Sequence, residues 1–143
     1  MKEKISIFKA EDKKIADIDL FDTPVMAGFP SPAEDYVEKK LDLNEHLITH
    51  PAATFFVKVE GESMKEANIF KGDIIIVDRS IQPENGSIVV AVVNQEFTLK
   101  RLLIKEKKIF LQPENKDYLP MEIKPDWNFE VWGVVTYIIH KAK

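Results

Sequence analysis

The sequence predicts a mainly β domain that is preceded by an arm and a short helix. From Ala53 onward, runs of β-branched and aromatic residues are separated by turns rich in Gly, Pro, Asn and Asp. The chain has 143 residues, a length that favours one domain with a substantial core. It contains neither internal repeats nor low-complexity segments. These observations together favour one β-rich globular domain.

The N-terminal part predicts little regular structure. Residues 1–23 are charged with scattered apolar side chains and sustain no period of 3.6, so we expect an arm with a short strand. The next residues should be mostly extended, because Pro and Gly recur at Pro24, Gly28, Pro30 and Pro32.

A helix is predicted to open at Ser31-Pro32-Ala33-Glu34. This stretch combines a Ser N-cap, a Pro in the first turn and a Glu at the third helical position. The apolar face of the predicted helix consists of Ala33, Val37 and Leu41. A second short helical turn is expected to begin at Asp42 and to end before Pro51.

Six strands are predicted in the rest of the chain. They span Thr54 to Glu60, Ile74 to Val77, Ser87 to Val93, Glu96 to Leu103, Lys108 to Gln112, and Glu130 to His140. Turns are expected at Lys71-Gly72-Asp73, at Pro83-Glu84-Asn85-Gly86 and at Asn94-Gln95. The basic cluster Lys105-Glu106-Lys107-Lys108 is typical of a solvated hairpin tip.

The composition excludes several classes of protein. The formal charge is −4 and the isoelectric point about 5.4, so a basic nucleic-acid-binding surface is not indicated. Without cysteines, neither disulfides nor thiolate metal sites are available, which fits a reducing compartment. The longest apolar run, Ile88 to Val93, is too short for a membrane span, and no signal peptide is evident. We expect a cytoplasmic protein without membrane contact.

Ser63, in the turn Gly61-Glu62-Ser63-Met64, is a candidate nucleophile. A serine hydroxyl needs a neighbouring base, and the histidines are poorly placed for that role. Lys100 is the candidate base, since Ser-Lys pairs are a known variant of catalytic triads. The lysine must be neutral to act so, and its apolar flanks in Phe97 to Ile104 favour desolvation.

Non-catalytic interpretations of Ser63 and Lys100 stay open. A serine in a glycine-containing turn is usually only part of the turn. Both faces of the strand from Phe97 to Ile104 are largely apolar, so either Lys100 or Arg101 must lie near the core or extend to solvent at a sheet edge. Only the lysine can serve as a base, because arginine stays protonated.

A substrate for Ser63 is present in the chain itself, at Val25-Met26-Ala27-Gly28-Phe29. Alanine fits a small pocket before a scissile bond, and glycine after it lets the backbone approach a nucleophile closely. The extended, proline-bounded segment suits docking as an added strand, although both residues are also ordinary in a linker. His46 and His50 are four residues apart and suit one helical face as metal ligands, but surface or capping roles are the simpler interpretation, and we expect neither a metal nor a cofactor.

Several motifs resemble the self-cleaving LexA-type serine peptidases, and most closely their SOS mutagenesis branch. The order and spacing of Ala27-Gly28, Gly61-Glu62-Ser63-Met64 and Phe97-Thr98-Leu99-Lys100-Arg101-Leu102 match that family. Further likeness lies in Gly28 to Ala33, Asp35 to Glu38, Asp42 to Asn44, His50-Pro51, Phe56 to Lys58, Gly72-Asp73, Ile76 to Asp78, Pro113-Glu114-Asn115 and Gly133 to Val135. The resemblance runs from about Gly28 to the C-terminus. Two departures are Ala27, where the mutagenesis proteins can carry cysteine, and Glu62, where aspartate is common.

This resemblance implies a LexA C-terminal-like catalytic β domain that forms a homodimer. Activated RecA filaments on single-stranded DNA would favour cleavage, in which Ser63, deprotonated by Lys100, attacks the Ala27 carbonyl. The backbone N–H groups of Ser63 and Met64 would form the oxyanion hole. Cleavage would remove an arm, residues 1–27, and leave residues 28–143 as the active form. That form would join a UmuC-like Y-family DNA polymerase in translesion synthesis, with no direct sequence-specific DNA binding of its own.

Three other classes of protein share some of these features. A phage or LexA-like repressor needs a DNA-binding domain, and residues 1–27 are too short to supply a helix-turn-helix domain. A signal-peptidase-like enzyme needs a membrane anchor, which we do not find. A non-catalytic β-domain adaptor would keep the fold and use only its surface.

Overall fold

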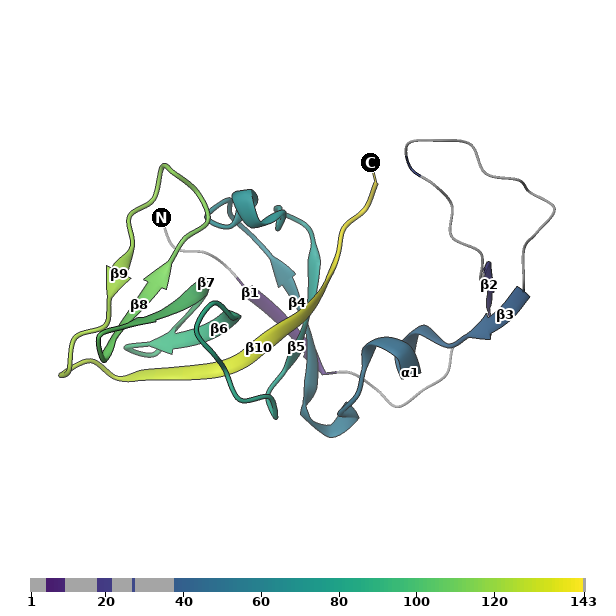
Figure 1. The fold of residues 1–143 in the computed structure, drawn as a ribbon, viewed down its shortest axis with the longest axis horizontal. Helices are drawn as coiled ribbons and strands as arrows, with labels where there is room; N and C mark the ends of the chain where they lie inside the picture. Colours follow the sequence, from purple (N-terminus) through teal and green to yellow (C-terminus); the bar gives the residue numbers. More distant parts are fainter. Residues whose placement is uncertain (1–4, 10–17, 22–26, 28–37, 143) are drawn as a thin grey trace. The chain divides into compact units, whose positions relative to one another are not determined.

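Eight antiparallel strands form the main sheet of the protein. The computed structural model describes residues 5–9, 18–21, 27 and 38–142, and the chain divides into two compact units, Met1–Ala10 with His50–Lys143, and Glu11–Thr49. The strands of the larger unit are β1 (Ile5–Lys9), β4 (Thr54–Val59), β5 (Ile74–Asp78), β6 (Ile88–Val93), β7 (Glu96–Lys105), β8 (Lys108–Gln112), β9 (Met121–Glu122) and β10 (Phe129–Ile139) (Figure 1). The sheet order is β1-β4-β5-β10-β6-β7-β8-β9. The predicted mainly β fold is therefore confirmed.

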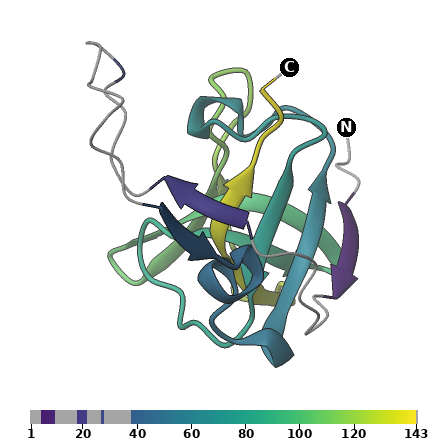
Figure 2. The same ribbon diagram turned by 90° about the vertical axis from the view of Figure 1, so that its right-hand side faces the viewer.

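The six predicted strands are present with small shifts at their ends, and the main sheet also contains β1 and β9. Residues 1–23 were expected to hold one short strand and contain two, β1 and β2 (Ile18–Phe21). β1 pairs with β4 from Ile5 opposite Val59 to Lys9 opposite Phe55 (Figure 2). β9 is only two residues long and pairs with β8. Two short 3-10 helices, η1 (Pro51–Ala53) and η2 (Lys65–Ala67), flank β4 along the chain.

The smaller unit contains β2 (Ile18–Phe21), β3 (Glu38–Leu41) and the helix α1 (Leu43–Leu47). Asp42 caps α1 by accepting a hydrogen bond from the N–H of Asn44, so the predicted second helical turn is confirmed. The helix predicted to open at Ser31 is wrong at its C-terminal end, because Glu38–Leu41 is a strand. Pairing of β3 with the distant β2 overrides the local helical pattern there. Residues 31–37 lie outside the described residues.

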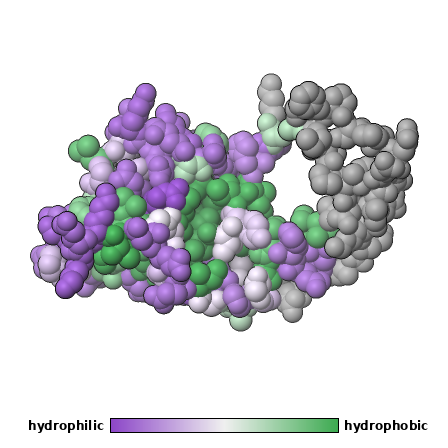
Figure 3. All heavy atoms as spheres, viewed as in Figure 1, coloured by the Kyte–Doolittle hydropathy of each residue, from purple (hydrophilic) through white to green (hydrophobic). Residues whose placement is uncertain are grey.

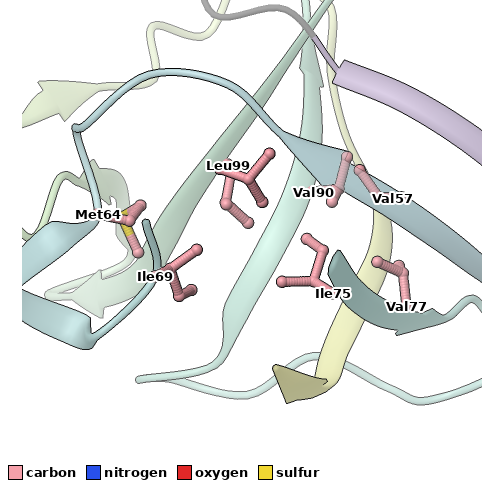
Figure 4. Close-up of a cluster of buried hydrophobic side chains, with 8 residues drawn as sticks. Val57, Met64, Ile69, Ile75, Val77, Val90 and Leu99 are labelled. Atoms are coloured by element: carbon pink, nitrogen blue, oxygen red, sulfur yellow. The ribbon is translucent and has the colours of Figure 1, made fainter. Parts of the chain in front are cut away.

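Both faces of the central strands β6 and β7 are covered by apolar side chains. One core cluster includes Val90 of β6 and Leu99 of β7 and extends over β4 and β5 (Figure 4). A second cluster includes Val89 of β6 and Leu102 of β7. Because successive residues of a strand point to opposite faces, the two clusters cover the two sides of β6 and β7.

The turns follow the residues that favour them. Gly72 and Gly86 adopt φ angles of 92° and 93°, as expected of glycines in the two predicted turns. Asn94 and Gln95 both have positive φ, which is the geometry of a two-residue hairpin turn between β6 and β7. Glu106 and Lys107 do the same between β7 and β8, and the Lys105–Lys108 cluster is indeed an exposed hairpin tip.

The larger unit leaves some apolar side chains at its surface. Figure 3 shows green apolar patches among the purple polar residues on the face in view. On the paired strands β5 and β10, Ile74, Tyr137 and Ile139 are each more than a third exposed. Ile74 lies directly opposite Ile139 in the ladder, so these two side chains share one face of the sheet.

Candidate functional site

Ser63 lies in the turn between β4 and η2, and its side chain is almost fully buried. Gly61, two residues earlier, has a φ of 92°, a conformation that glycine adopts at little cost. Met64, the next residue, inserts its side chain into the core cluster beside Ile69 and Leu99 (Figure 4). The backbone conformation of Gly61 therefore fixes the turn before Ser63, and the buried side chain of Met64 fixes it after Ser63.

Lys100 lies in the interior of the sheet. It is part of β7, which pairs with β6 on one side and β8 on the other, and it stands opposite Val89. The side chain is half-buried and does not extend to solvent at a sheet edge. Arg101, its neighbour on the opposite face, forms an ion pair with Glu114 and donates a hydrogen bond to the Gly86 carbonyl. Arg101 and Glu114 thus pair on the face of β7 opposite Lys100.

The structure brings Ser63 and Lys100 into direct contact. Lys100 Nζ lies 3.1 Å from Ser63 Oγ, although the two residues are 37 positions apart in the sequence. The same nitrogen is 2.8 Å from Thr98 Oγ1 and 3.0 Å from the Leu99 carbonyl oxygen. Thr98 precedes Lys100 by two residues on the same strand face, which explains their proximity. A lysine amine therefore sits between a fixed hydroxyl, a fixed carbonyl and the candidate nucleophile.

A neighbouring loop, residues 113–117, holds the Ser63 turn in place. The side-chain amide of the buried Asn115 donates a hydrogen bond of 2.7 Å to the Glu62 carbonyl. The Glu114 carbonyl accepts from the Glu66 N–H at 2.7 Å, and the Glu114 N–H points to Met64 Sδ at 3.4 Å. Neither Asn115 nor Thr98 was predicted to have a role in the site. The only signal for Asn115 was its place in the family-like motif Pro113-Glu114-Asn115.

The predicted cleavage site is only partly described. Ala27 is exposed and belongs to the smaller unit, in the segment that joins β2 to β3. Gly28 lies outside the described residues. The scissile bond between them stays a prediction.

Two buried aspartates bracket β5, and each contacts a histidine. Asp78 Oδ2 lies 2.6 Å from His50 Nδ1, and Asp73 Oδ1 lies 2.6 Å from His140 Nδ1. Burial raises the pKa of Asp78, but hydrogen bonds from the Ser80 hydroxyl, from His50 and from the Ser80 N–H outweigh it, so the pKa falls below its ordinary value. These pairs stabilise the two ends of β5. None of their residues is adjacent in the sequence to Ser63 or Lys100.

The histidine pair suggested as metal ligands does not share a helical face. His46 is in α1, whereas His50 lies beyond the end of the helix and contacts Asp78. Within the described ranges, no three His, Cys, Asp or Glu side chains gather as a metal site would require. In the same part of the chain, no helix has the length and apolarity to cross a membrane.

Comparison with known proteins identifies relatives of most of the chain. Residues 19–136 match the family described as peptidase S24-like. Protein MucA of Salmonella typhimurium is 43% identical over 136 residues, which cover 94% of this chain and 92% of MucA. Protein SamA of Salmonella typhimurium is 47% identical over 124 residues, 87% of this chain and 86% of SamA. The LexA repressor of Idiomarina loihiensis is 44% identical over 119 residues, 82% of this chain and 58% of the repressor.

Proposed function

Because the chain belongs to the peptidase S24-like family of self-cleaving serine peptidases, and within it to the UmuD-like SOS mutagenesis proteins, we propose that Ser63 and Lys100 are its catalytic dyad. The observation that carries the proposal is the 3.1 Å contact between Lys100 Nζ and Ser63 Oγ. Family membership makes a serine nucleophile expected, and the contact supports this serine and this lysine as the pair.

The surroundings of Lys100 suit a neutral amine. Such an amine has two N–H donors and one lone pair. Thr98 Oγ1 and the Leu99 carbonyl accept the two N–H groups, at 2.8 and 3.0 Å, which turns the lone pair toward Ser63 Oγ. In that state the Ser63 hydroxyl donates its proton to Nζ as Oγ becomes a nucleophile. The half-buried position of Lys100 favours the uncharged form, because desolvation disfavours the ammonium.

The proposed reaction cuts the bond between Ala27 and Gly28. Ser63 Oγ attacks the Ala27 carbonyl carbon, and the serine proton passes to Lys100. The C–N bond then breaks, and the Lys100 ammonium gives its proton to the departing Gly28 amine. Water, deprotonated by the neutral lysine, hydrolyses the acyl-enzyme and frees the Ala27 carboxylate. Backbone N–H groups of Ser63 and Met64 would stabilise the oxyanion, in a turn held by Asn115.

We further propose the regulation and the partners that this branch of the family implies. RecA filaments on single-stranded DNA would promote the cut, residues 1–27 would be the removed arm, and residues 28–143 would bind a UmuC-like Y-family polymerase for translesion synthesis. Because the chain is acidic, RecA and the polymerase would make the contacts with DNA. The protein would act in the cytoplasm. The exposed Ile74, Tyr137 and Ile139 on β5 and β10 support a homodimer through that face.

Incubation with RecA, ATP and single-stranded DNA tests this function. We expect wild-type chain to yield two fragments, with Gly28 as the new N-terminus by mass spectrometry, and Ser63→Ala to stay intact while remaining folded. A wild-type chain that stays intact, although a LexA repressor in the same tube cleaves itself, would favour the non-catalytic adaptor. A cut that persists in Ser63→Ala would remove the proposed nucleophile.

A further inference from the structure

Strand β1 occupies one edge of the main sheet, and it belongs to residues 1–27, the arm on the N-terminal side of the proposed cut. Its five residues pair with β4 in unbroken antiparallel register, from Ile5 opposite Val59 to Lys9 opposite Phe55 (Figure 2). Ile7 is partly buried and packs against the core cluster that contains Val57 and Val59. β1 therefore contributes both ladder hydrogen bonds and apolar contact to the larger unit.

A second strand of the same arm is paired as well. β2 forms a four-residue antiparallel ladder with β3, from Ile18 opposite Leu41 to Phe21 opposite Glu38. β2 precedes Ala27 and β3 follows Gly28, so the proposed cut falls in the segment that connects two paired strands. Hydrolysis there breaks one peptide bond and no ladder hydrogen bond of either pair.

We propose that cleavage leaves residues 1–27 bound to residues 28–143 as a nicked, non-covalent complex, with the outer edge of β4 as the principal docking surface for the arm. The inference takes only the position of the cut from the proposed function. Release of the arm is then a second step, separate from chemistry.

The two pairings act together as a bivalent attachment. Each short ladder alone would be weak, since isolated two-stranded pairs are marginal in water. β1 and β2 lie on one fragment, so whenever one pair opens, the other keeps its partner at a high effective concentration. Loss of the arm requires both pairs to open at once, which makes release much slower than opening of either pair.

Departure of the arm changes the surface of the remaining protein. It uncovers the N–H and C=O groups of β4 that β1 satisfies, and an open strand edge is a template for a strand of another chain. The cut itself does not create that edge. The surface becomes available only when β1 leaves.

The test uses the full chain and an external protease. A recognition sequence for a site-specific protease is inserted between Ala27 and Gly28 in a Ser63→Ala chain, so the cut does not depend on the proposed dyad. After complete cutting, the sample passes through gel filtration without denaturant, and intact masses are read across the protein peak. We expect the arm fragment to co-elute with the larger fragment and to separate from it in guanidinium.

Paired proline substitutions test whether β1 is the strand that keeps the arm bound after the cut. Alternate residues of an antiparallel strand bond to the neighbour, so Ile7→Pro with Phe8→Pro removes at least one β1–β4 hydrogen bond whichever residue donates it. We expect the arm to dissociate at least about tenfold faster in this variant. The matched control, Glu11→Pro with Asp12→Pro, changes the same fragment outside the described strands and should stay within about twofold of the unchanged arm.

Hydrogen exchange gives an independent readout on the unchanged sequence. The Val59 N–H donates to the Asp73 carbonyl, so by alternation Phe56 and Lys58 are the β4 residues that bond toward β1. Their amides should exchange slowly in the nicked complex and faster once the arm has dissociated, whereas the Val59 amide should change little. Loss of the unchanged arm on the first gel filtration would overturn the proposal. So would equal retention in the Ile7/Phe8 variant and its control, or exchange at Phe56 and Lys58 that does not change when the arm dissociates.

Discussion

The side-chain amide of Asn115 donates a 2.7 Å hydrogen bond to the main-chain carbonyl of Glu62, the residue before Ser63. Asn115 is 4% exposed, and its Oδ1 accepts the N–H of Asp117 at 2.9 Å. The asparagine thus joins its own loop to the turn of the proposed nucleophile. Neither Glu62 nor Ser63 contributes a side chain to that bond, so it controls the backbone path of the turn.

Asn115→Asp should slow self-cleavage by about tenfold or more. The carboxylate keeps the acceptor for Asp117 but cannot donate to Glu62, and an unsatisfied buried group costs about 1–3 kcal/mol. Rates would be read from fragment formation at several pH values. A positioning role predicts the same fractional loss at each pH, because Lys100 is untouched.

Asn128→Asp is the matched control, since Asn128 is exposed. It should cleave like the wild type. A normal rate in Asn115→Asp would show that the Asn115–Glu62 bond does not position Ser63.

Thr98→Val should reduce self-cleavage by about tenfold, since it removes the hydroxyl that accepts from Lys100 Nζ at 2.8 Å and leaves the shape of the side chain nearly unchanged. Thr98→Ser restores a hydroxyl and should recover most of the rate. The comparison of the two variants by gel densitometry separates hydrogen bonding from packing. If serine and valine were equally slow, the lost methyl packing or strand propensity would be responsible instead.

Gly133→Ala should destabilise the fold without touching the site. An added Cβ would lie 2.4 Å from Val77 Cγ1, and Val77 is fully buried between paired strands. Overpacking of this kind costs about 1–3 kcal/mol, measured as a lower midpoint in urea unfolding. Gly86→Ala is a useful comparison, because its added Cβ meets nothing within 4 Å and its cost comes from the φ of 93°. Wild-type stability in Gly133→Ala would mean that β5 and β10 can separate locally.

Asp78 should contribute to stability at neutral pH and lose that contribution in acid. Its hydrogen bonds with Ser80 and His50 hold the pKa of the folded state below the ordinary value, so the carboxylate form is favoured by folding. The contribution is complete above the unfolded pKa of about 3.9 and disappears as pH falls through the folded pKa. Urea unfolding of wild type and Asp78→Asn should therefore differ at pH 6 and converge near pH 2. A constant difference across that range would contradict this linkage.

The strands were predictable because their signals are local. β-branched runs such as Ile74 to Val77 and turn pairs such as Asn94-Gln95 specify strands and hairpins by themselves. The apolar character of both faces of β7 also predicted that a cation of this strand lies near the core unless it extends to solvent at a sheet edge. Local signals failed at Glu38–Leu41, where pairing with the distant β2 decides the structure, and at the two-residue β9.

The site was predictable only in part. Ser63 and Lys100 could be chosen by chemistry and by resemblance, but their contact depends on the path of β7 beside a turn 37 residues earlier. Asn115 and Thr98 are common polar residues, and nothing in their local sequence indicates a backbone carbonyl or a lysine nitrogen as the partner. Their roles follow from the tertiary structure alone.

The pH dependence of self-cleavage without RecA tests the proposed lysine base most directly. The measurement is the first-order rate of fragment formation in purified chain from about pH 7 to pH 11, with folding checked at each point. Because a free lysine has a pKa of about 10.4, we expect a slow rate near neutrality that rises through one ionisation as Lys100 loses its proton. Lys100→Ala should not cleave at any pH, whereas Lys105→Ala, on the exposed end of the same strand, should follow the wild type. Cleavage by Lys100→Ala at the wild-type rate, or a wild-type rate that falls as pH rises while the fold persists, would contradict a Ser63–Lys100 dyad.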